Sequence, residues 1–454
     1  MQDPAQTQDL LGQLPLLKAY NHLLLGFATP DGVSQSAIVS SLEAAALKLT
    51  THIPWLGGKV VNVGAGDGTS GAFQVVPCDK FAPPNSILIV KDCTDLCPPW
   101  EELMKAKAPI SILDGKTLCP RDAFPISYPD SEEDPAPALL IQLNLIKGGV
   151  LLNLAGQHNL SDGGGLIQIF NLLATTLRGE EYPPTAVENA TQDRRNLIRL
   201  LGPGEPPLDH SHLVRPPPGS LRLSLPNSPF VWQYFRFSAV KLAELKNRAS
   251  NAADFDPAVR FISTNDATCA FLWQRILSVR LRRRQTPDDL CKFSRAVDVR
   301  RMMGISPEYM GVTVSNASCY LTFREVTTSS LSFLASTLRQ PLSQVNEYAV
   351  RSFATFLSQT EDKTPIAYAG KFNPDTDMGI SSIAGAPLYH MDFGPLLGKV
   401  ELVRRPNFSP IMSTIYLMPE TRNKDVDMLV CLPEVDIQAL RDDPEWTAYV
   451  EYIG

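Results

Sequence analysis

A proline-rich stretch near the middle of the chain most constrains how the 454 residues can fold. Residues 179–219 are polar and contain prolines at positions 183, 184, 203, 206, 207 and 216–218. A connection this long is uncommon inside a compact domain. We therefore predict an N-terminal domain at 1–180, a crossover linker at 181–224 and a C-terminal domain at 225–454.

The bulk composition indicates a globular protein and excludes some partners. Hydrophobic residues make up 44% of the chain and charged residues 20%, which is ordinary, and the length suffices to bury a sizeable core. A net charge of −7 argues against nucleic acid, because phosphate binding needs a basic surface. None of the eight cysteines forms a CxxC pair, so we expect free thiols in a reducing compartment. His210 and His212 in the linker are weak signals, and we expect no metal.

No targeting or membrane segment is expected. The N-terminus, Met1 to Thr7, is polar and lacks the basic start of a signal peptide. No apolar run approaches the roughly 18 residues of a membrane-spanning helix. The sequon Asn159-Leu160-Ser161 lies inside the motif described next, where a glycan would block the site. We predict a cytoplasmic protein that binds no membrane.

The pattern of elements places His158 where a strand ends and a helix begins. Residues 138–146 and 149–155 are apolar and predict a hairpin around Lys147-Gly148. The second strand leads to His158, and a helix with apolar residues at 166, 170, 173 and 177 follows Gly163–Gly165. Further signals predict a helix at 37–49 and a strand at 59–63. Residues 64–68 predict a hairpin turn, which we favour over a nucleotide-binding loop. Both halves mix strands and helices without regular alternation, which favours mixed α/β layers over a doubly wound sheet.

The motif His158-Asn159-Leu160-Ser161-Asp162-Gly163 carries the chemistry of acyl transfer to a hydroxyl. A neutral imidazole at His158 can take the hydroxyl proton, since it titrates near working pH. Asp162 can orient this histidine directly or can lock the loop. Gly163 and Gly164 leave backbone N–H groups uncovered at a helix start, where developing negative charge is favoured. Without a GxSxG elbow or a recognisable catalytic cysteine, we predict direct transfer in a ternary complex.

The second half carries two helix caps and a basic cluster. Ser238 and Ser263 are predicted N-caps of helices. Four arginines follow the second helix, at positions 280, 282, 283 and 284. We favour a solvated helix end, where positive charge suits the helix dipole. The alternative is a seat for the phosphates of an anionic cofactor.

These motifs resemble the BAHD acyl-CoA transferases across nearly the whole chain. The His158–Gly163 stretch is similar to the family's HxxxDG, and Asp392-Phe393-Gly394 is similar to its DFGWG. Further matching blocks lie at 38–60, at 263–267 with Trp273, and at 296–300 with Tyr309 and Gly311. The segments 297–307, 398–399 and 403–406 resemble the fungal trichothecene 3-O-acetyltransferase branch.

The resemblance implies two chloramphenicol-acetyltransferase-like domains around a central solvent tunnel. Acyl-CoA enters from one face and a hydroxylated small molecule from the other, and they meet at His158 in a protein expected to be a monomer. Part of about 375–410 crosses back to the first domain. Asp162 is implied to shape the loop, and Asp392, beside Gly394, to be structural and paired with Arg300. The expected CoA contacts are Ser263, Asn265, Arg282 and Ser413.

The sequence departs from the family at two points. Pro395 and Leu396 stand where DFGWG has its tryptophan and last glycine, so the acceptor pocket or oxyanion environment is expected to differ. Condensation domains of peptide synthetases carry HHxxxDG, but Gln157 stands at the first histidine here. We predict an acyl-CoA-dependent O-acyltransferase, with acetyl-CoA or another acyl-CoA as donor and a fungal terpenoid or polyketide as acceptor. Two alternatives are a CoA-independent cyclisation, dehydration or isomerisation in the same fold and a non-catalytic binding protein.

Overall fold

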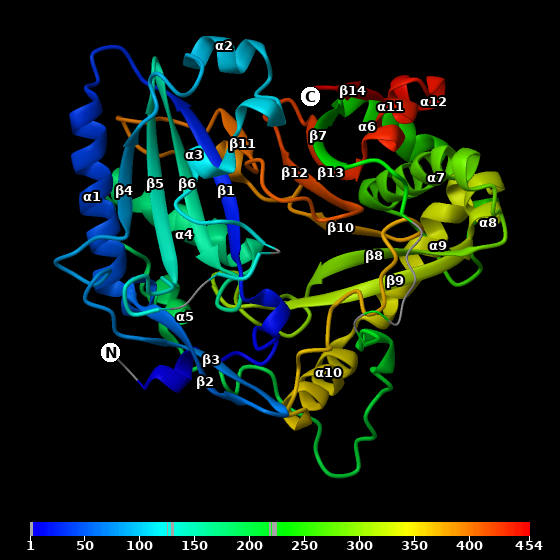
Figure 1. Ribbon diagram of the computed structural model, residues 1–454, viewed down its shortest axis with the longest axis horizontal. Coiled ribbons are helices and arrows are strands. Elements are labelled where there is room, and N and C mark those ends of the chain that lie inside the picture. Colours follow the sequence, from blue (N-terminus) through cyan, green and yellow to red (C-terminus); the bar gives the residue numbers. More distant parts are fainter. Residues whose placement is uncertain (1–2, 125, 129–130, 218, 220–224) are drawn as a thin grey trace.

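Two large β-sheets lie side by side in the computed structural model, which describes residues 3–124, 126–128, 131–217, 219 and 225–454 (Figure 1). The first sheet has the order β11-β1-β6-β5-β4. Its strands span Tyr20–Ala28 (β1), Leu88–Asp92 (β4), Leu139–Ile146 (β5), Gly149–Gln157 (β6) and Leu402–Arg404 (β11). The predicted hairpin is β5–β6, whose strands are buried almost throughout and therefore have nearly continuous apolar sequences.

The second sheet has the order β14-β7-β13-β12-β10-β8-β9. Its strands span Phe230–Phe237 (β7), Leu290–Asp298 (β8), Val314–Thr322 (β9), Met378–Ser382 (β10), Thr414–Glu420 (β12), Val426–Pro433 (β13) and Val450–Tyr452 (β14). β10 runs parallel to β8 and β12, whereas the other pairs in this sheet are antiparallel. A separate hairpin joins Lys59–Gly66 (β2) and Thr69–Val76 (β3), which confirms the predicted turn at 64–68.

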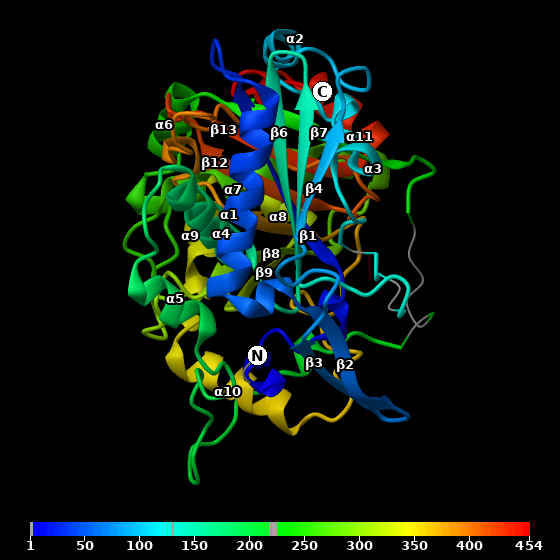
Figure 2. The ribbon, with the colours of Figure 1, turned by 90° about the vertical axis from the view of Figure 1, so that its left-hand side faces the viewer.

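Helices cover both sheets, as predicted for mixed α/β layers. In the first half they span Gln35–His52 (α1), Trp100–Lys105 (α2), Gly115–Leu118 (α3), Gly163–Leu177 (α4) and Pro184–Thr191 (α5). In the second they span Ala239–Arg248 (α6), Thr264–Arg284 (α7), Phe323–Thr328 (α8), Leu331–Gln344 (α9), Glu347–Gln359 (α10), Glu434–Arg441 (α11) and Pro444–Thr447 (α12). α1 packs on α4 and lies in front of the first sheet in Figure 2. The predicted caps Ser238 and Ser263 are confirmed at the starts of α6 and α7.

The chain crosses between the sheets near its end. After β10 in the second sheet it adds β11 to the edge of the first, beside β1, and then returns as β12. This path supports the expected crossing within about 375–410. The limits 1–180, 181–224 and 225–454 stay a prediction, and residues 218 and 220–224 of the linker lie outside the described residues.

A third apolar core joins parts of the two halves. It combines residues of the N-terminal segment, such as Leu11 and Leu14, with Val299, Tyr309 and Val312 after β8. Residues of α10 complete it, including Val350, Phe353 and Leu357. This core lies against the loop that carries His158, because Asn159 contacts the N-terminal segment directly.

Candidate active site

His158 follows the last residue of β6 and is held by the start of β1. The register places Tyr20 opposite Gln157, and the next amide continues the ladder, with His158 N donating to Ala19 O at 2.8 Å. The chain then turns sharply, because the amides of Leu160 and Ser161 both donate to Gln157 O at 3.1 Å. His158 keeps part of its surface accessible, whereas the residues on either side of it in this loop are buried. The imidazole of His158 is therefore the partly accessible side chain on a loop whose main chain is held by hydrogen bonds.

The surroundings of His158 favour the neutral imidazole. Burial lowers the pKa of His158 below its usual value, and the negative charge of Asp162 opposes part of that decrease. The positive charge of Arg405 lowers the pKa further. The Phe124 ring lies edge-on to the imidazole, with 5.9 Å between ring centroids. A neutral imidazole is the form that accepts a proton, so this site suits a general base.

Asp162 locks the loop and makes no direct hydrogen bond to His158. Its Oδ1 accepts from Gly165 N at 3.0 Å, which caps α4, and from Arg300 Nη2 at 2.7 Å. Its Oδ2 accepts from Arg300 Nη1 and Thr313 N, each at 3.0 Å, and from Thr313 Oγ1 at 3.3 Å. Both oxygens are thus filled by donors other than the imidazole. The sequence left two roles open for Asp162, orienting His158 or locking the loop. These contacts favour locking the loop.

The predicted pairing of Arg300 with Asp392 is wrong. Arg300 pairs with Asp162, and both side chains are about 95% buried or more. Asp392 instead accepts from Gly394 N at 2.9 Å in its own turn, and its backbone carbonyl accepts from Arg178 Nη1 at 2.8 Å. Arg300 belongs to the segment after β8, which reaches the His158 loop across the junction of the two sheets.

The Asp392-Phe393-Gly394 turn sits at the far end of α4 from His158. Gly394 has φ of 78°, and an added Cβ would lie 2.3 Å from Leu177 O, in the last turn of that helix. α4 has 15 residues, so at about 1.5 Å rise per residue its ends are roughly 20 Å apart. Pro395 is exposed. This separation from His158 does not support the expectation that Pro395 alters the acceptor pocket or oxyanion environment, which stays a prediction.

The three glycines at the start of α4 permit close packing. An added Cβ on Gly165 would lie 2.1 Å from Met310 O, and one on Gly164 would lie 2.9 Å from Arg300 Nη1. Gly163 is less crowded, with Ile383 Cγ2 at 3.5 Å from the same ideal position. The glycines thus let the Arg300 segment approach the helix start. The first-turn amides of Gly163 and Gly164 have no carbonyl partner within the helix.

A cavity of about 310 Å³ lies between the start of α7, the strands β8 and β10, and the segment after β10. Its lining includes Asn265 at the beginning of α7, Arg295 on β8, and Ser382 and Gly385. Ser382 precedes Ile383, the neighbour of Gly163. Among the residues predicted to contact CoA, Asn265 therefore lines a cavity, and a second lining residue, Ser382, is adjacent in sequence to the neighbour of Gly163.

The other three residues predicted to contact CoA lie outside this cavity's lining. Ser263 forms a capping box with Asp266, in which its hydroxyl donates to the carboxylate at 2.8 Å. Arg282 pairs with Asp443 at 3.1 Å. Ser413 is fully buried and accepts from Arg280 Nη2 at 2.7 Å. The structure does not gather these three side chains around one site.

Three of the four arginines in the basic cluster of α7 form neither a solvated helix end nor an open phosphate seat, whereas Arg282 is 61% exposed. Arg280 is fully buried and pairs with Asp436 at 3.1 Å, and Arg283 pairs with Asp436 at 2.8 Å. Arg283 and Arg284 also pair with Asp375. The favoured interpretation of a solvated helix end is therefore wrong for these three arginines, which tie α7 to α11 and to the segment before β10.

Three residues near the loop carried no recognisable sequence signal as site residues. Arg405 follows β11, donates to Asn21 Oδ1 at 2.8 Å, and places its guanidinium 4.2 Å from the centre of the Tyr416 ring. Asn21 is opposite Gly156 in the sheet, so its side chain lies on the same face as His158. Arg194, after α5, donates to Leu160 O at 2.9 Å, and Asp9 accepts from Gly12 N at 2.6 Å in the N-terminal segment. Their separation in sequence from His158 hid all three.

Comparison with known proteins identifies the class to which this fold and loop belong. Residues 105–447 match the Transferase family, and residues 19–176 match the trichothecene 3-O-acetyltransferase-like N-terminal domain. The O-acyltransferase pigD of Monascus ruber is 63% identical over the full length of both chains. The O-acetyltransferase epaC of Aspergillus niger is 46% identical over 100% of this chain and 98% of its own. The crystal structure of F. graminearum TRI101 complexed with coenzyme A and deoxynivalenol has a TM-score of 0.90 at 31% identity, covering 98% of this chain and 99% of that one.

The chain belongs to the Transferase family, within its fungal trichothecene 3-O-acetyltransferase-like branch. The predicted family, the mixed α/β fold and the acyltransferase class are confirmed. Across the residues that the structure describes, no helix is both long and apolar enough to cross a bilayer. The same residues contain no cluster of three or more histidine, cysteine, aspartate or glutamate side chains suited to a metal ion.

Proposed function

We propose that the protein transfers an acyl group from acyl-CoA to a hydroxyl of a fungal secondary metabolite, a terpenoid or polyketide, with His158 as general base. The observation that carries this proposal is the partly accessible imidazole of His158, whose pKa burial lowers, on a loop fixed by Asp162 and Arg300. The relatives support the substrate classes, since the TRI101 structure holds coenzyme A and deoxynivalenol. Acetyl-CoA is the first donor to test, because the A. niger relative is an O-acetyltransferase.

The proposed reaction passes directly from thioester to ester. His158 takes the proton of the acceptor hydroxyl as its oxygen attacks the thioester carbonyl. The C–O bond forms, and the carbonyl becomes a tetrahedral oxyanion, for which the amides of Gly163 and Gly164 are the nearest helix-start donors. Collapse of this intermediate breaks the C–S bond, and the imidazolium returns its proton to the departing CoA thiolate.

The cavity lined by Asn265 is proposed to hold part of the acyl-CoA. The support is that its lining residue Ser382 precedes Ile383, whose side chain is the neighbour of Gly163 at the start of α4. The roles of Ser263, Arg282 and Ser413 as CoA contacts remain proposals with less support, because their side chains already bond to protein groups. No specific observation favours the CoA-independent alternative, since its motive was the altered Pro395 region.

The test follows CoA thiol release from acetyl-CoA with a panel of hydroxylated polyketides and terpenoids. A positioned general base contributes about 10²–10⁴ in rate, so we expect His158→Ala to lower kcat roughly 10³-fold. His390→Ala is the matched control, because His390 is exposed. Near wild-type turnover by His158→Ala refutes the base assignment. Calorimetric titration of the wild type with CoA separates the alternatives, since absent binding favours CoA-independent chemistry.

We further propose that the protein works as a monomer in the cytoplasm. The eight cysteines support a reducing location, because all of them are free thiols. Light scattering of the purified protein and fractionation of the producing cells test the two statements separately.

A further inference from the structure

The N-terminal segment contacts the loop of His158 directly. Asn159, the residue after the base, donates through Nδ2 to Leu14 O at 3.0 Å and also to Gly12 O. Its Oδ1 accepts from Gln157 Nε2 at 2.8 Å, so the side chain is bonded on both sides. Gly12 lies so close that an added Cβ would be 2.2 Å from Asn159 O. The main chain beside His158 therefore rests on the main chain at position 12.

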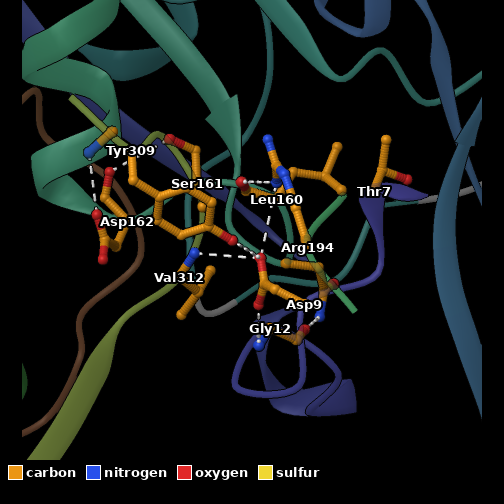
Figure 3. Close-up of polar contacts among 12 residues, drawn as sticks. Thr7, Asp9, Gly12, Leu160, Ser161, Asp162, Arg194, Tyr309 and Val312 are labelled. Atoms are coloured by element: carbon orange, nitrogen blue, oxygen red, sulfur yellow. Dashed lines mark hydrogen bonds and ion pairs between the residues drawn. The ribbon is translucent and has the colours of Figure 1, made fainter. Parts of the chain in front are cut away.

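Asp9 fixes this contact and connects it to the clamp on Asp162. Its Oδ1 accepts from Gly12 N at 2.6 Å, which closes a turn in the N-terminal segment. Its Oδ2 accepts from Val312 N at 3.2 Å and from Tyr309 OH at 3.5 Å (Figure 3). Tyr309 belongs to the same segment as the Arg300 contacts, because Arg300 Nε donates to Tyr309 O at 3.1 Å. The buried Asp9 carboxylate thus connects the N-terminal segment to the segment that carries Arg300 and Tyr309, and both segments contact the His158 loop.

Arg194 holds the loop from a third direction. Its Nη1 donates to Leu160 O at 2.9 Å and lies 3.6 Å from Asp9 Oδ2 (Figure 3). The guanidinium lies over the Trp55 ring at 4.5 Å, and its main-chain amide donates to Gln6 O at 2.9 Å. Only 2% of the Arg194 side chain is exposed, so its position is tightly defined.

Burying the Asp9–Arg194 pair carries a desolvation cost. Burial raises the pKa of Asp9 to about 6, although the charge of Arg194 opposes the increase. A buried ion pair is weak evidence for added stability, because removing both charges from water costs about as much as their attraction returns. A role in fixing the geometry of the neighbouring loop explains why such a pair lies directly behind it.

We propose that the N-terminal segment 3–17 and Arg194 form a brace that positions His158 for proton transfer, with Asp9, Gly12 and Arg194 as positioning residues. The inference rests on the proposed role of His158 as base. None of the three touches the reacting atoms. They act through Asn159 and Leu160, the two residues that follow the base. A misplacement of about 1 Å in a catalytic group can reduce the rate about 10²-fold.

Arg194→Met tests the brace, with Arg194→Lys as the conservative variant. We expect Arg194→Met to lower kcat about 30-fold, while KM for acetyl-CoA stays within about threefold of wild type. Arg194→Lys keeps the charge and one donor toward Leu160 O, so we expect recovery to within about threefold of wild-type kcat. Arg199→Met is the matched control, because Arg199 is exposed and lies five residues further along the same stretch, outside the brace. A purely structural role would lower the melting temperature but leave kcat of the folded protein unchanged.

A second variant keeps the inference testable if Arg194→Met does not fold. Gly12→Ala forces the position-12 main chain away from Asn159 O, and we expect at least a tenfold loss of kcat with unchanged circular dichroism. Gly66→Ala is its control, since an added Cβ there meets nothing within 4 Å and its φ is not positive. Wild-type kcat in folded Gly12→Ala or Arg194→Met refutes the brace, provided that His158→Ala is inactive. An active His158→Ala refutes the proposed function and the brace together.

Discussion

Replacing Arg300 with methionine should destabilise the protein strongly and release the loop of His158. The substitution leaves the Asp162 carboxylate, of which 3% is exposed, without its cation. Breaking a buried pair in this way costs about 3–5 kcal/mol. The carboxylate keeps its bonds from Gly165 and Thr313, which argues for the lower end of that range. The carbonyls of Tyr309 and Gly311 each lose a donor, which costs about 1 kcal/mol more, so we expect a total destabilisation of about 4 kcal/mol.

The assay is thermal unfolding, followed by circular dichroism, at several pH values. For a cooperative unit of about 200 residues, 4 kcal/mol corresponds to a decrease in Tm of about 10 °C. Arg300 holds the pKa of Asp162 below its usual value, so the pair stabilises the fold above about pH 4 and loses this effect as pH falls through the folded pKa. The difference in Tm between wild type and Arg300→Met should therefore narrow in acid.

The control is Arg324→Met, which removes an exposed ion pair to Asp288. The two side chains are 59% and 77% exposed, so their pairing contributes about 0–1 kcal/mol. If Arg300→Met melts within about 2 °C of Arg324→Met at pH 7, the clamp does not have the stabilising effect inferred from its burial.

Two further predictions concern the charge near His158 and the turn at the far end of α4. Arg405→Gln removes a positive charge that lowers the pKa of His158, so the acidic limb of the kcat/KM pH profile should move to higher pH, while Arg405→Lys should leave it in place. An unmoved limb in Arg405→Gln excludes this electrostatic effect. Gly394→Ala should cost about 2–4 kcal/mol, because the new Cβ meets Leu177 O at 2.3 Å in a residue with φ of 78°. The folded fraction of Gly394→Ala should keep wild-type kcat. A large loss of kcat would show that the turn affects the active site. Gly398→Ala is the control for backbone strain alone, because Gly398 has a positive φ but an added Cβ there meets nothing within 4 Å.

The local parts of the site were predictable from the sequence because they depend on local rules. Two apolar runs around Lys147-Gly148 specify a hairpin, and glycines before an apolar stripe specify a helix start. Together they place His158 at a strand–helix junction. Ser263 and Asp266, three residues apart, specify a capping box in the same way.

The long-range contacts were not predictable in this way. Arg300 follows Asp162 by 138 positions, and nothing in either residue's local sequence selects its partner over Asp392. The arginines of α7 present a similar case. A basic helix end alone indicates solvent, but the carboxylates that bury Arg280 and Arg283 come from Asp375 and Asp436, far along the chain. Ion pairs between residues far apart in the sequence depend on the tertiary fold, so the local sequence does not specify them.

The supports of His158 come from separate parts of the chain, and this has a consequence for how the active site is assembled. β1 and β6 fix the main chain of His158 within the first sheet, whereas Arg300 and Thr313 reach Asp162 from the ends of β8 and β9 in the second. The junction therefore positions the loop of His158, the proposed base. The first sheet alone would retain His158 but leave Asp162 without its cation and without the amide of Thr313. The observed conformation of the His158 loop thus requires both halves of the chain to be folded against each other.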